Sequence, residues 1–324
     1  MKYKQKLNTK YITMTQEKIK LWMAQMRAPF LLLAILLVAI GLAFGWKYHP
    51  PGTEFNPFHA IMLIVGVVSA HISVNLFNEY SDTKTEIDMH TQRTAFSGGS
   101  GIVSSGKLST KSVFRMAIAT FLLAFGIGLY FSLATHWIIA LFTALGGLTI
   151  LFYTNFLAKI GLGELFAGLT LGTFVVLGSY VAMTADPSMA IGELFPRDVL
   201  LISIPPGILT ALLLLINEFP DVEADKTGGR KHLVISLGRK KAAIVYTLGM
   251  FATFGVIIGA ALFNIVSPWF MLALIPVPLA YKAVQGAIKH GDNIPKLAPA
   301  LGMNVITVLL TDLLIAVSVI METF

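Results

Sequence analysis

Long apolar runs alternate with short polar segments along most of the chain. A helix needs about 20 consecutive apolar residues to cross the hydrocarbon core of a bilayer, and nine segments meet that requirement. They are residues 29–47, 58–79, 112–133, 135–157, 162–184, 198–219, 242–264, 267–285 and 299–321. The pattern predicts an all-α membrane protein with nine transmembrane helices.

Composition supports the same class. The chain is 56% hydrophobic and 13% charged, whereas soluble domains are about 25% charged. It contains no cysteine, which excludes disulfides, thiolate zinc sites and cysteine nucleophiles. The net charge of +7 is better explained by Lys and Arg in cytoplasmic loops than by nucleic acid. We therefore expect the lipid bilayer, and no nucleic acid, as a partner.

The distribution of Lys and Arg predicts the orientation. With a cytoplasmic N-terminus, every Lys and Arg except Lys47 and Arg197 falls on the cytoplasmic side, which is the asymmetry typical of membrane proteins. Residues 1–28 are polar and basic, and we expect a cytoplasmic segment there, followed by a single domain over residues 29–324. The apolar run that begins at Pro29 is too long for a signal peptide. Without an Arg/Ser-rich leader, a prokaryotic cell membrane is the favoured location.

Two polar segments share the pattern Asn-Glu-aromatic-x-Asp, and each follows an apolar run. The first contains Asn75, Asn78, Asp82 and Glu86, with Asp88 beyond the expected helix end, and the second contains Asn217, Asp221 and Asp225. Residues three and four apart share one face of a helix, so each segment is expected to present an amide and carboxylates together. Both are predicted at cytoplasmic helix ends. Their separation by four predicted helices suggests an internal repeat, whose interface often holds the site.

Two acidic segments that face each other predict a binding site for Mg²⁺ and a diphosphate. Mg²⁺ prefers oxygen ligands and usually takes a few carboxylates together with substrate phosphates. The predicted metal ligands are Asn78, Asp82, Glu86, Asp88, Asn217, Asp221 and Asp225. A single acidic cluster is more often a solvated helix end, but two matched copies on one side of a membrane favour a functional site.

Basic residues accompany the acidic segments. The candidates for diphosphate binding are Arg27, Lys84, Arg93, Lys107, Arg230 and Lys231. Arg binds phosphate bidentately, yet positive-inside topology explains most of these residues without a ligand, so we expect two or three true ligands. The glycine-rich segment 96–101 is either an anion cradle built from backbone N–H groups or a flexible linker.

Other polar residues stand out from the apolar background. Tyr153 either stabilises a developing cation through its ring or belongs to an interfacial aromatic belt. Glu164 is expected to be a buried acid if it faces the bundle. Asp312 lies in the middle of an apolar run, where it is costly unless paired, and a structural role is favoured. The chain has no His-x-x-x-His pair, so zinc chemistry has no support.

These motifs resemble the UbiA superfamily of intramembrane prenyltransferases, and most closely its 1,4-dihydroxy-2-naphthoate polyprenyltransferase branch in menaquinone biosynthesis. The resemblance spans nearly the whole chain. It rests on residues 75–82 with Asp88, on 161–164 with 177–180, on 217–225 leading into 229–238, and on Arg27-Ala-Pro29. Glu79 departs from the branch, which often has Asp there, and segment 96–101 lacks the arginine associated with the menaquinone enzymes.

The resemblance implies nine helices around a central cavity and an Mg²⁺-dependent reaction. A polyprenyl group would pass from an allylic polyprenyl diphosphate to an aromatic acceptor, 1,4-dihydroxy-2-naphthoate, with Asp82, Asp221 and Tyr153 as catalytic candidates. Other acceptors known in the superfamily are 4-hydroxybenzoate, homogentisate, a glycerol phosphate ether and haem. A secondary transporter is the alternative outside the superfamily. Prenyl chain length and oligomeric state do not follow from the sequence.

Overall fold

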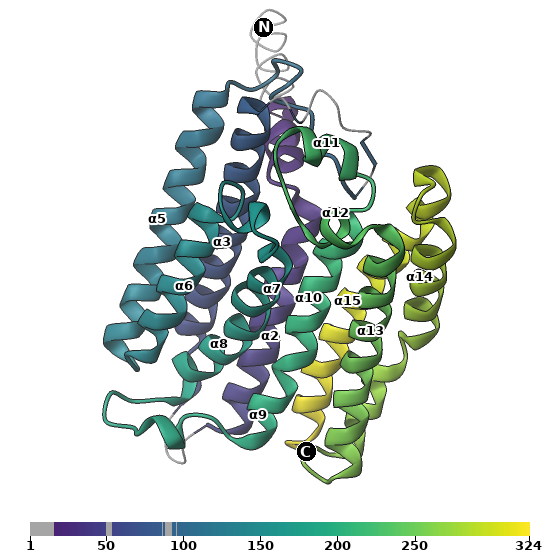
Figure 1. Cartoon of the computed structure of the whole chain (residues 1–324). Coiled ribbons are helices and arrows are strands. Elements are labelled where there is room, and N and C mark those ends of the chain that lie inside the picture. Colours follow the sequence, from purple (N-terminus) through teal and green to yellow (C-terminus); the bar gives the residue numbers. More distant parts are fainter. Residues whose placement is uncertain (1–15, 50–53, 86, 88–92, 95) are drawn as a thin grey trace, which may run out of the picture.

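The computed structural model describes residues 16–49, 54–85, 87, 93–94 and 96–324, and every regular element within these ranges is helical. Eight helices, some assembled from consecutive shorter elements, are long and apolar enough to cross a membrane. They stand side by side in a bundle (Figure 1). The prediction of an all-α membrane protein is confirmed.

The eight candidate spans follow the predicted segments closely. They are η1 Ala28–Phe30 with α2 Leu31–Lys47, α3 Pro57–Lys84, α5 Thr110–Ala134, α7 Gly163–Gly168 with η3 Leu169–Thr173 and α8 Phe174–Thr184, α9 Arg197–Ile202 with α10 Ile204–Asn217, α13 Arg239–Leu262, η5 Pro268–Leu274 with α14 Val277–His290, and α15 Ile294–Met321. Short helices η4 Ile191–Glu193, α11 Val222–Thr227 and α12 Leu233–Leu237 lie between them.

The predicted fourth span is shorter than expected. Helix α6 covers Ile138–Phe152, which is 15 residues, and turns follow before the short helix η2 Leu157–Lys159. The predicted end at residue 157 is therefore wrong. Two side chains just beyond Phe152 form hydrogen bonds with α3. The Thr154 hydroxyl donates to Asn78 Oδ1 at 3.1 Å, and Asn155 Oδ1 accepts from the Ser81 hydroxyl at 3.2 Å.

The two acidic segments differ in secondary structure. Helix α3 continues to Lys84, past its predicted boundary, and so carries Asn78 and Asp82 on one face. The second segment was also expected to be one helix, and this is wrong. Helix α10 ends at Asn217, a turn follows, and α11 begins at Val222. Pro220 lies in that turn, where it has no N–H to donate to a continuing helix.

Close packing of small residues fixes the helices behind the acidic segments. A Cβ on Gly172 would lie 2.6 Å from the Gly207 Cα, and one on Gly168 would lie 2.6 Å from the Gly207 carbonyl oxygen. Only glycines permit this approach of α7 and η3 to α10. The contact therefore holds the start of the fifth span against the helix that leads into the second acidic segment.

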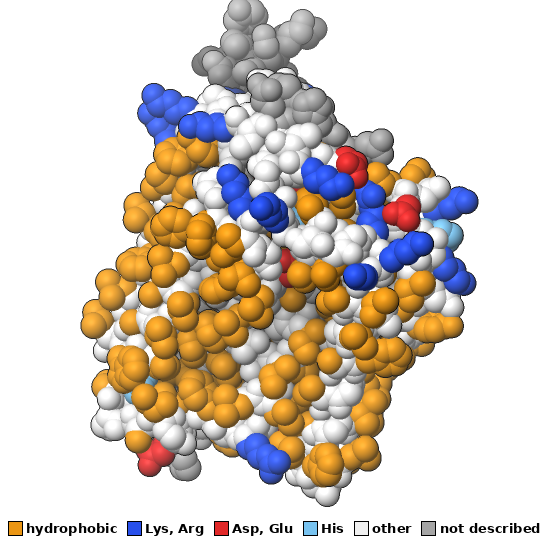
Figure 2. Space-filling model, in the orientation of Figure 1, with side chains coloured by type: hydrophobic (Ala, Val, Ile, Leu, Met, Phe, Trp, Pro, Cys, Tyr) orange, Lys and Arg blue, Asp and Glu red, His pale blue; other side chains and the backbone are white. Residues whose placement is uncertain are grey.

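Apolar side chains occupy both the interior and the outside of the bundle. Leu37, Ile40 and Phe44 of α2 are fully or nearly fully buried in the core, whereas Phe251 and Leu262 of α13 are more than 70% exposed. Figure 2 shows a broad band of hydrophobic side chains, with Lys and Arg gathered mainly in the upper half of the view. Exposed apolar surface of this extent is expected of a protein in contact with lipid.

Candidate active site

One cavity of about 190 Å³ receives side chains from both acidic segments. Its lining includes Asn75, Asn78 and Asp82 from α3, Asn217, Asp221 and Asp225 from the second segment, and also Arg27, Tyr153, Arg230 and His232. The sequence places the two segments far apart, and the bundle brings them to the same cavity.

Arg230 joins the two acidic segments across the cavity. Its guanidinium donates to Asp225 Oδ1 at 2.6 Å, forms an ion pair with Asp82, and lies 3.3 Å from Asn78 Oδ1. Burial alone would lower the pKa of Arg230, but the neighbouring Asp82 and Asp225 carboxylates raise it, so the guanidinium stays charged. Breaking a buried pair of this kind leaves uncompensated charge and is strongly destabilising.

The first segment is held in place by a short chain of hydrogen bonds. Asn78 donates from Nδ2 to Asp82 Oδ2 at 3.1 Å, and its Oδ1 accepts from Thr154 at 3.1 Å. Thr154 lies in the turn after α6. The early end of α6 therefore supplies a hydroxyl that orients the amide of Asn78.

The second segment keeps oxygen atoms without partners. Asn217 Oδ1 and Asp221 Oδ1 are buried, and neither accepts a hydrogen bond within the described chain. The pKa of Asp221 is raised to about 7, because burial and the Asp225 charge outweigh the opposing effects of Arg27, Arg230 and the backbone of Gly98. Buried oxygens without partners, next to further carboxylates, are the donor set that suits Mg²⁺. The residues present therefore fit this ion.

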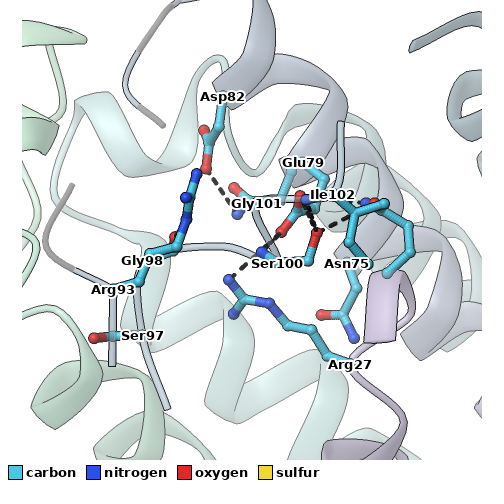
Figure 3. A network of polar contacts seen from close by, with 12 residues as sticks. Arg27, Asn75, Glu79, Asp82, Arg93, Ser97, Gly98, Ser100, Gly101 and Ile102 are labelled. Atoms are coloured by element: carbon cyan, nitrogen blue, oxygen red, sulfur yellow. Dashed lines mark hydrogen bonds and ion pairs between the residues drawn. The ribbon is translucent and has the colours of Figure 1, made fainter. Parts of the chain in front are cut away.

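Arg27 approaches the cavity from the segment before α2. Its backbone has φ 54, a left-handed conformation that is unusual for a residue with a side chain and that clusters at functional sites. The guanidinium lies 3.9 Å from Glu79 Oε1. Figure 3 shows Arg27, Glu79 and Ser100 directed toward one another.

These features agree with a comparison against known proteins. Residues 35–306 match the sequence profile of the UbiA prenyltransferase family. The chain belongs to the UbiA prenyltransferase family. It is 32% identical over 222 residues to a 1,4-dihydroxy-2-naphthoate octaprenyltransferase of Bacillus subtilis (strain 168), a match that covers 68% of each chain. The protein is thus an enzyme, a membrane prenyltransferase.

Solved UbiA structures share its fold. The apo structure of a UbiA homologue from Aeropyrum pernix K1 superimposes with a TM-score of 0.67 at 17% identity, over 91% of this chain and 98% of that one. A UbiA homologue from Archaeoglobus fulgidus bound to DMAPP and Mg²⁺ gives a TM-score of 0.52 at 14% identity, over 91% of this chain and 99% of that one. At these identities the likeness establishes the fold.

Glu79 anchors the glycine-rich loop of this UbiA-family chain. Glu79 is 1% exposed. Its carboxylate accepts hydrogen bonds from the backbone N–H and the hydroxyl of Ser100, the latter at 2.9 Å, and from Gln25 Nε2 at 3.2 Å. The sequence pattern assigned no role to this acid. Its spacing, four residues after Asn75 and three before Asp82, was the available signal, because residues three and four apart are neighbours on a helix.

The glycine-rich loop forms part of the cavity wall. Gly98 and Gly99 line the cavity with φ of 87 and 70, a region that glycine alone enters without strain. Arg93 lies on the loop, donating to the Gly98 carbonyl at 3.3 Å and to Ser104 Oγ at 2.8 Å. Whether this segment is an anion cradle or a flexible linker stays a prediction.

The structure separates the six basic candidates of this UbiA enzyme. Arg27 and Arg230 line the cavity. Lys84, Arg93, Lys107 and Lys231 are exposed and do not belong to its described lining. Lys84 instead lies over the ring of Tyr80, with Nζ 4.7 Å from the centroid. The predicted ligands Glu86 and Asp88 lie outside the described residues.

Tyr153 and three further polar residues complete the site. Tyr153 follows α6 directly and lines the cavity. Burial, and then the nearby Glu218 charge, raise the pKa of its phenol well above the usual value, so it remains a neutral phenol at physiological pH. Glu164, Glu218 and His232 form a buried cluster beside it. The sequence raised Glu164 only as a possible buried acid and did not identify the cluster.

Proposed function

We propose that this enzyme transfers a polyprenyl group from an allylic polyprenyl diphosphate to 1,4-dihydroxy-2-naphthoate, in an Mg²⁺-dependent reaction of menaquinone biosynthesis. One observation carries the proposal. Both acidic segments line a single cavity, in which the buried Asn217 Oδ1 and Asp221 Oδ1 lack hydrogen-bond partners among the described residues. The acceptor is proposed from the name of the Bacillus subtilis relative.

The two acidic segments would hold Mg²⁺ and, through it, the diphosphate. The proposed ligands are Asn78 and Asp82 on α3 and Asn217, Asp221 and Asp225 on the second segment, with Glu86 and Asp88 as further candidates outside the described residues. Bound Mg²⁺ would draw charge from the diphosphate and stabilise it as a leaving group. The bound DMAPP and Mg²⁺ of the Archaeoglobus fulgidus homologue support this assignment.

Two arginines and the glycine-rich loop would bind the remaining phosphate oxygens. Arg27, from the segment before α2, and Arg230, from the segment after Asp225, both line the cavity, and Arg forms bidentate bonds to phosphate. Gly98 and Gly99 contribute backbone to the same wall.

The prenyl tail would occupy an apolar groove next to the cavity. This groove of about 140 Å³ lies among α3, α5, α6 and the fifth span, and its lining includes Gly146 and Gly147 of α6. Leu171 lines both the groove and the polar cavity. Leu171 lies in η3, the π-helical turn. Such turns are frequent at functional sites, and here the turn separates the charged headgroup region from the tail region.

The aromatic acceptor would react at the Tyr153 end of the cavity. Departure of the diphosphate leaves an allylic cation, which the electron-rich naphthoate ring attacks. The Tyr153 ring is proposed to stabilise that cation. The membrane-embedded cavity excludes water, which would otherwise capture the cation as an alcohol. Loss of the acceptor carboxylate would accompany transfer, as the resemblance implies.

We also propose the membrane arrangement predicted from the sequence. With α6 as a ninth, shorter span, the chain would have a cytoplasmic N-terminus, and the site would face the cytoplasm of a prokaryotic cell. The gathering of Lys and Arg at one end of the visible face supports this orientation (Figure 2). Residues 1–28 would form a basic segment outside a single domain over residues 29–324.

A transfer assay in lipid nanodiscs tests the proposal. Labelled geranylgeranyl diphosphate, 1,4-dihydroxy-2-naphthoate and Mg²⁺ are supplied to wild type, Asp82→Ala, Asp221→Ala and the control Glu223→Ala, whose side chain is 72% exposed. We expect prenylated product from wild type and the control, and none from either cavity variant or after chelation. Diphosphate release without this product would reject the acceptor. Absence of any turnover would reject the reaction.

A further inference from the structure

Three buried polar side chains from separate segments converge at the wall of the cavity, which Glu218 and His232 line. Glu164 lies at the start of α7, Glu218 in the turn after α10, and His232 just before α12. They are 3%, 7% and 1% exposed, and one potential ligand atom of each lies within 4.8 Å of the others. No short sequence motif links the three residues. A motif such as His-x-x-x-His therefore could not have identified the cluster.

Hydrogen bonds from two backbone N–H groups hold the segments of this cluster together. The N–H of Lys231 donates to the Ala158 carbonyl at 2.8 Å, which fixes the segment before His232 against η2. The N–H of Leu233 donates to Glu164 Oε1 at 2.7 Å. Together with the glycine contacts between α7 and α10, these bonds preform the geometry.

Several polar atoms of the cluster have no hydrogen-bond partner in the described part of the chain. Glu164 Oε2, Glu218 Oε2 and both ring nitrogens of His232 are buried and make no hydrogen bond of acceptable geometry within the described chain. His232 Nδ1 lies 3.4 Å from Glu218 Oε2, and its Nε2 lies 3.2 Å from Asp225 Oδ2. These are contact distances without hydrogen-bond alignment. Buried polar atoms without partners are costly, so this many in one place indicates an occupant.

The local charge also calls for a cation. Arg230, the nearby guanidinium, is already paired with Asp82 and Asp225. Glu164 and Glu218 are both buried, and one oxygen of each lies within 4.8 Å of the other. Two buried carboxylates side by side must therefore share a proton or a cation.

We propose that Glu164, Glu218 and His232 bind a divalent transition-metal ion, of the Zn²⁺ or Mn²⁺ class, at a site separate from the Mg²⁺ ligands. Two carboxylate oxygens and an imidazole nitrogen are a common donor set for such ions. Mg²⁺, in contrast, prefers oxygen ligands and keeps several waters. The proposal stands on the cluster alone and does not depend on the prenyl transfer reaction.

This ion would tie three segments together at one point. Glu164 belongs to the fifth span, Glu218 to the turn that leads to Asp221, and His232 to the segment after Asp225. Its role would be to hold the second acidic segment against α7. Glu218 and His232 line the cavity and Glu164 does not, so the ion would bind at the cavity wall and position the segments that carry Asp221 and Asp225.

Pulsed EPR of Mn²⁺ bound to the purified full-length protein provides the test. The proposed Mg²⁺ ligands are all oxygen atoms, so Mn²⁺ at those positions gives no directly coordinated nitrogen signal. We expect a ¹⁴N coupling in wild type that is lost in His232→Gln and retained in His71→Gln, since His71 is the other histidine of the cavity lining. Asp82→Asn should also keep it, which separates this site from the Mg²⁺ ligands.

Metal analysis after equilibrium dialysis against Zn²⁺ with excess Mg²⁺ gives a second readout. Wild type should retain one Zn²⁺, and Glu164→Gln should bind it about 10- to 100-fold more weakly, a loss that even outer-shell changes can produce. Glu223→Gln is the matched control with an exposed acid. Absence of both the ¹⁴N coupling and Zn²⁺ retention in wild type would overturn the proposal and assign the cluster to a shared proton. The wild-type spectrum decides this even if a variant fails to fold.

Discussion

Asp82 and Asp225 lie on different helices and are joined by a single guanidinium, that of Arg230. The pairing connects the two acidic segments directly. It also places a fixed positive charge among the carboxylates that are proposed to hold Mg²⁺. Arg230 therefore has two proposed tasks, which are to keep these carboxylates close in the absence of ligand and to bind phosphate in its presence.

Replacing Arg230 with Gln should affect both stability and activity. The change leaves two buried carboxylates without their cation, for which we expect a loss of about 3–5 kcal/mol. Thermal unfolding in detergent measures this loss, and kcat/KM for prenyl transfer should fall about 100-fold or more. Arg230→Lys should recover part of the stability but little of the activity, because Lys cannot bridge two carboxylates with a planar fork. Wild-type activity in Arg230→Gln would contradict the phosphate role.

Asp221→Asn should raise the Mg²⁺ concentration needed for half-maximal activity. Asp221 Oδ1 has no hydrogen-bond partner in the described chain, so its charge is proposed to be available for the metal. Removing one carboxylate from the set weakens binding of a hard cation, and we expect about a tenfold change or more in an Mg²⁺ titration of initial rates. Glu223→Gln, in the same segment but exposed, should titrate as wild type. An unchanged midpoint in Asp221→Asn would exclude Asp221 as a ligand.

The sequence predicted the helices better than it predicted the site. Apolar runs identified the eight long spans because membrane helices are set by length and hydropathy. Helix ends were less predictable. Thr154 and Asn155 follow the end of α6 and form hydrogen bonds with Asn78 and Ser81 of α3. Pro220 interrupts the helix of the second acidic segment. Neither tertiary hydrogen bonding nor the geometry of a turn is visible in hydropathy.

Residue-level contacts were the hardest to anticipate. The sequence did not distinguish among the six basic candidates for diphosphate binding. Only the folded structure shows that Arg27 and Arg230 line the cavity while Lys107 and Lys231 lie outside its described lining. Glu218 and His232 were missed for the same reason, since their partners come from other segments. Spacing identifies residues that share one helix, but not clusters assembled from three.

Gly146→Leu should shorten the prenyl chain that the enzyme accepts. Gly146 lines the apolar groove, and a Cβ added there meets no atom within 4 Å, so the larger side chain projects into free space that the tail is proposed to fill. Competition between labelled diphosphates of different length should shift toward the shorter ones. Gly255→Leu is the control, because its Cβ is equally unobstructed and it lies outside the described groove lining. An unchanged preference in Gly146→Leu would place the tail elsewhere.

Glu79→Gln should loosen the glycine-rich loop. The carboxylate accepts two hydrogen bonds from Ser100 and lies 3.9 Å from Arg27 Nη2. Hydrogen bonds to a charged group contribute about 1.5–3 kcal/mol each, so the amide should weaken this anchor. We expect faster hydrogen exchange at residues 98–101 and a higher KM for the diphosphate, while Ser105→Ala, elsewhere in the loop region, should change neither. Unaltered exchange would show that the loop is held by other contacts.

Substitutions at Tyr153 should distinguish its ring from its hydroxyl. If the ring stabilises an allylic cation, Tyr153→Phe keeps the aromatic face and should retain most of kcat, whereas Tyr153→Leu removes it. A desolvated cation–π contact is worth about 2 kcal/mol, so kcat for Tyr153→Leu should fall about 30-fold. Single-turnover measurements separate this loss from a change in substrate binding. Equal losses in Phe and Leu would assign the effect to the phenol, whose pKa is raised by burial and by Glu218, and the hydroxyl would then be a proton or hydrogen-bond donor to the leaving diphosphate.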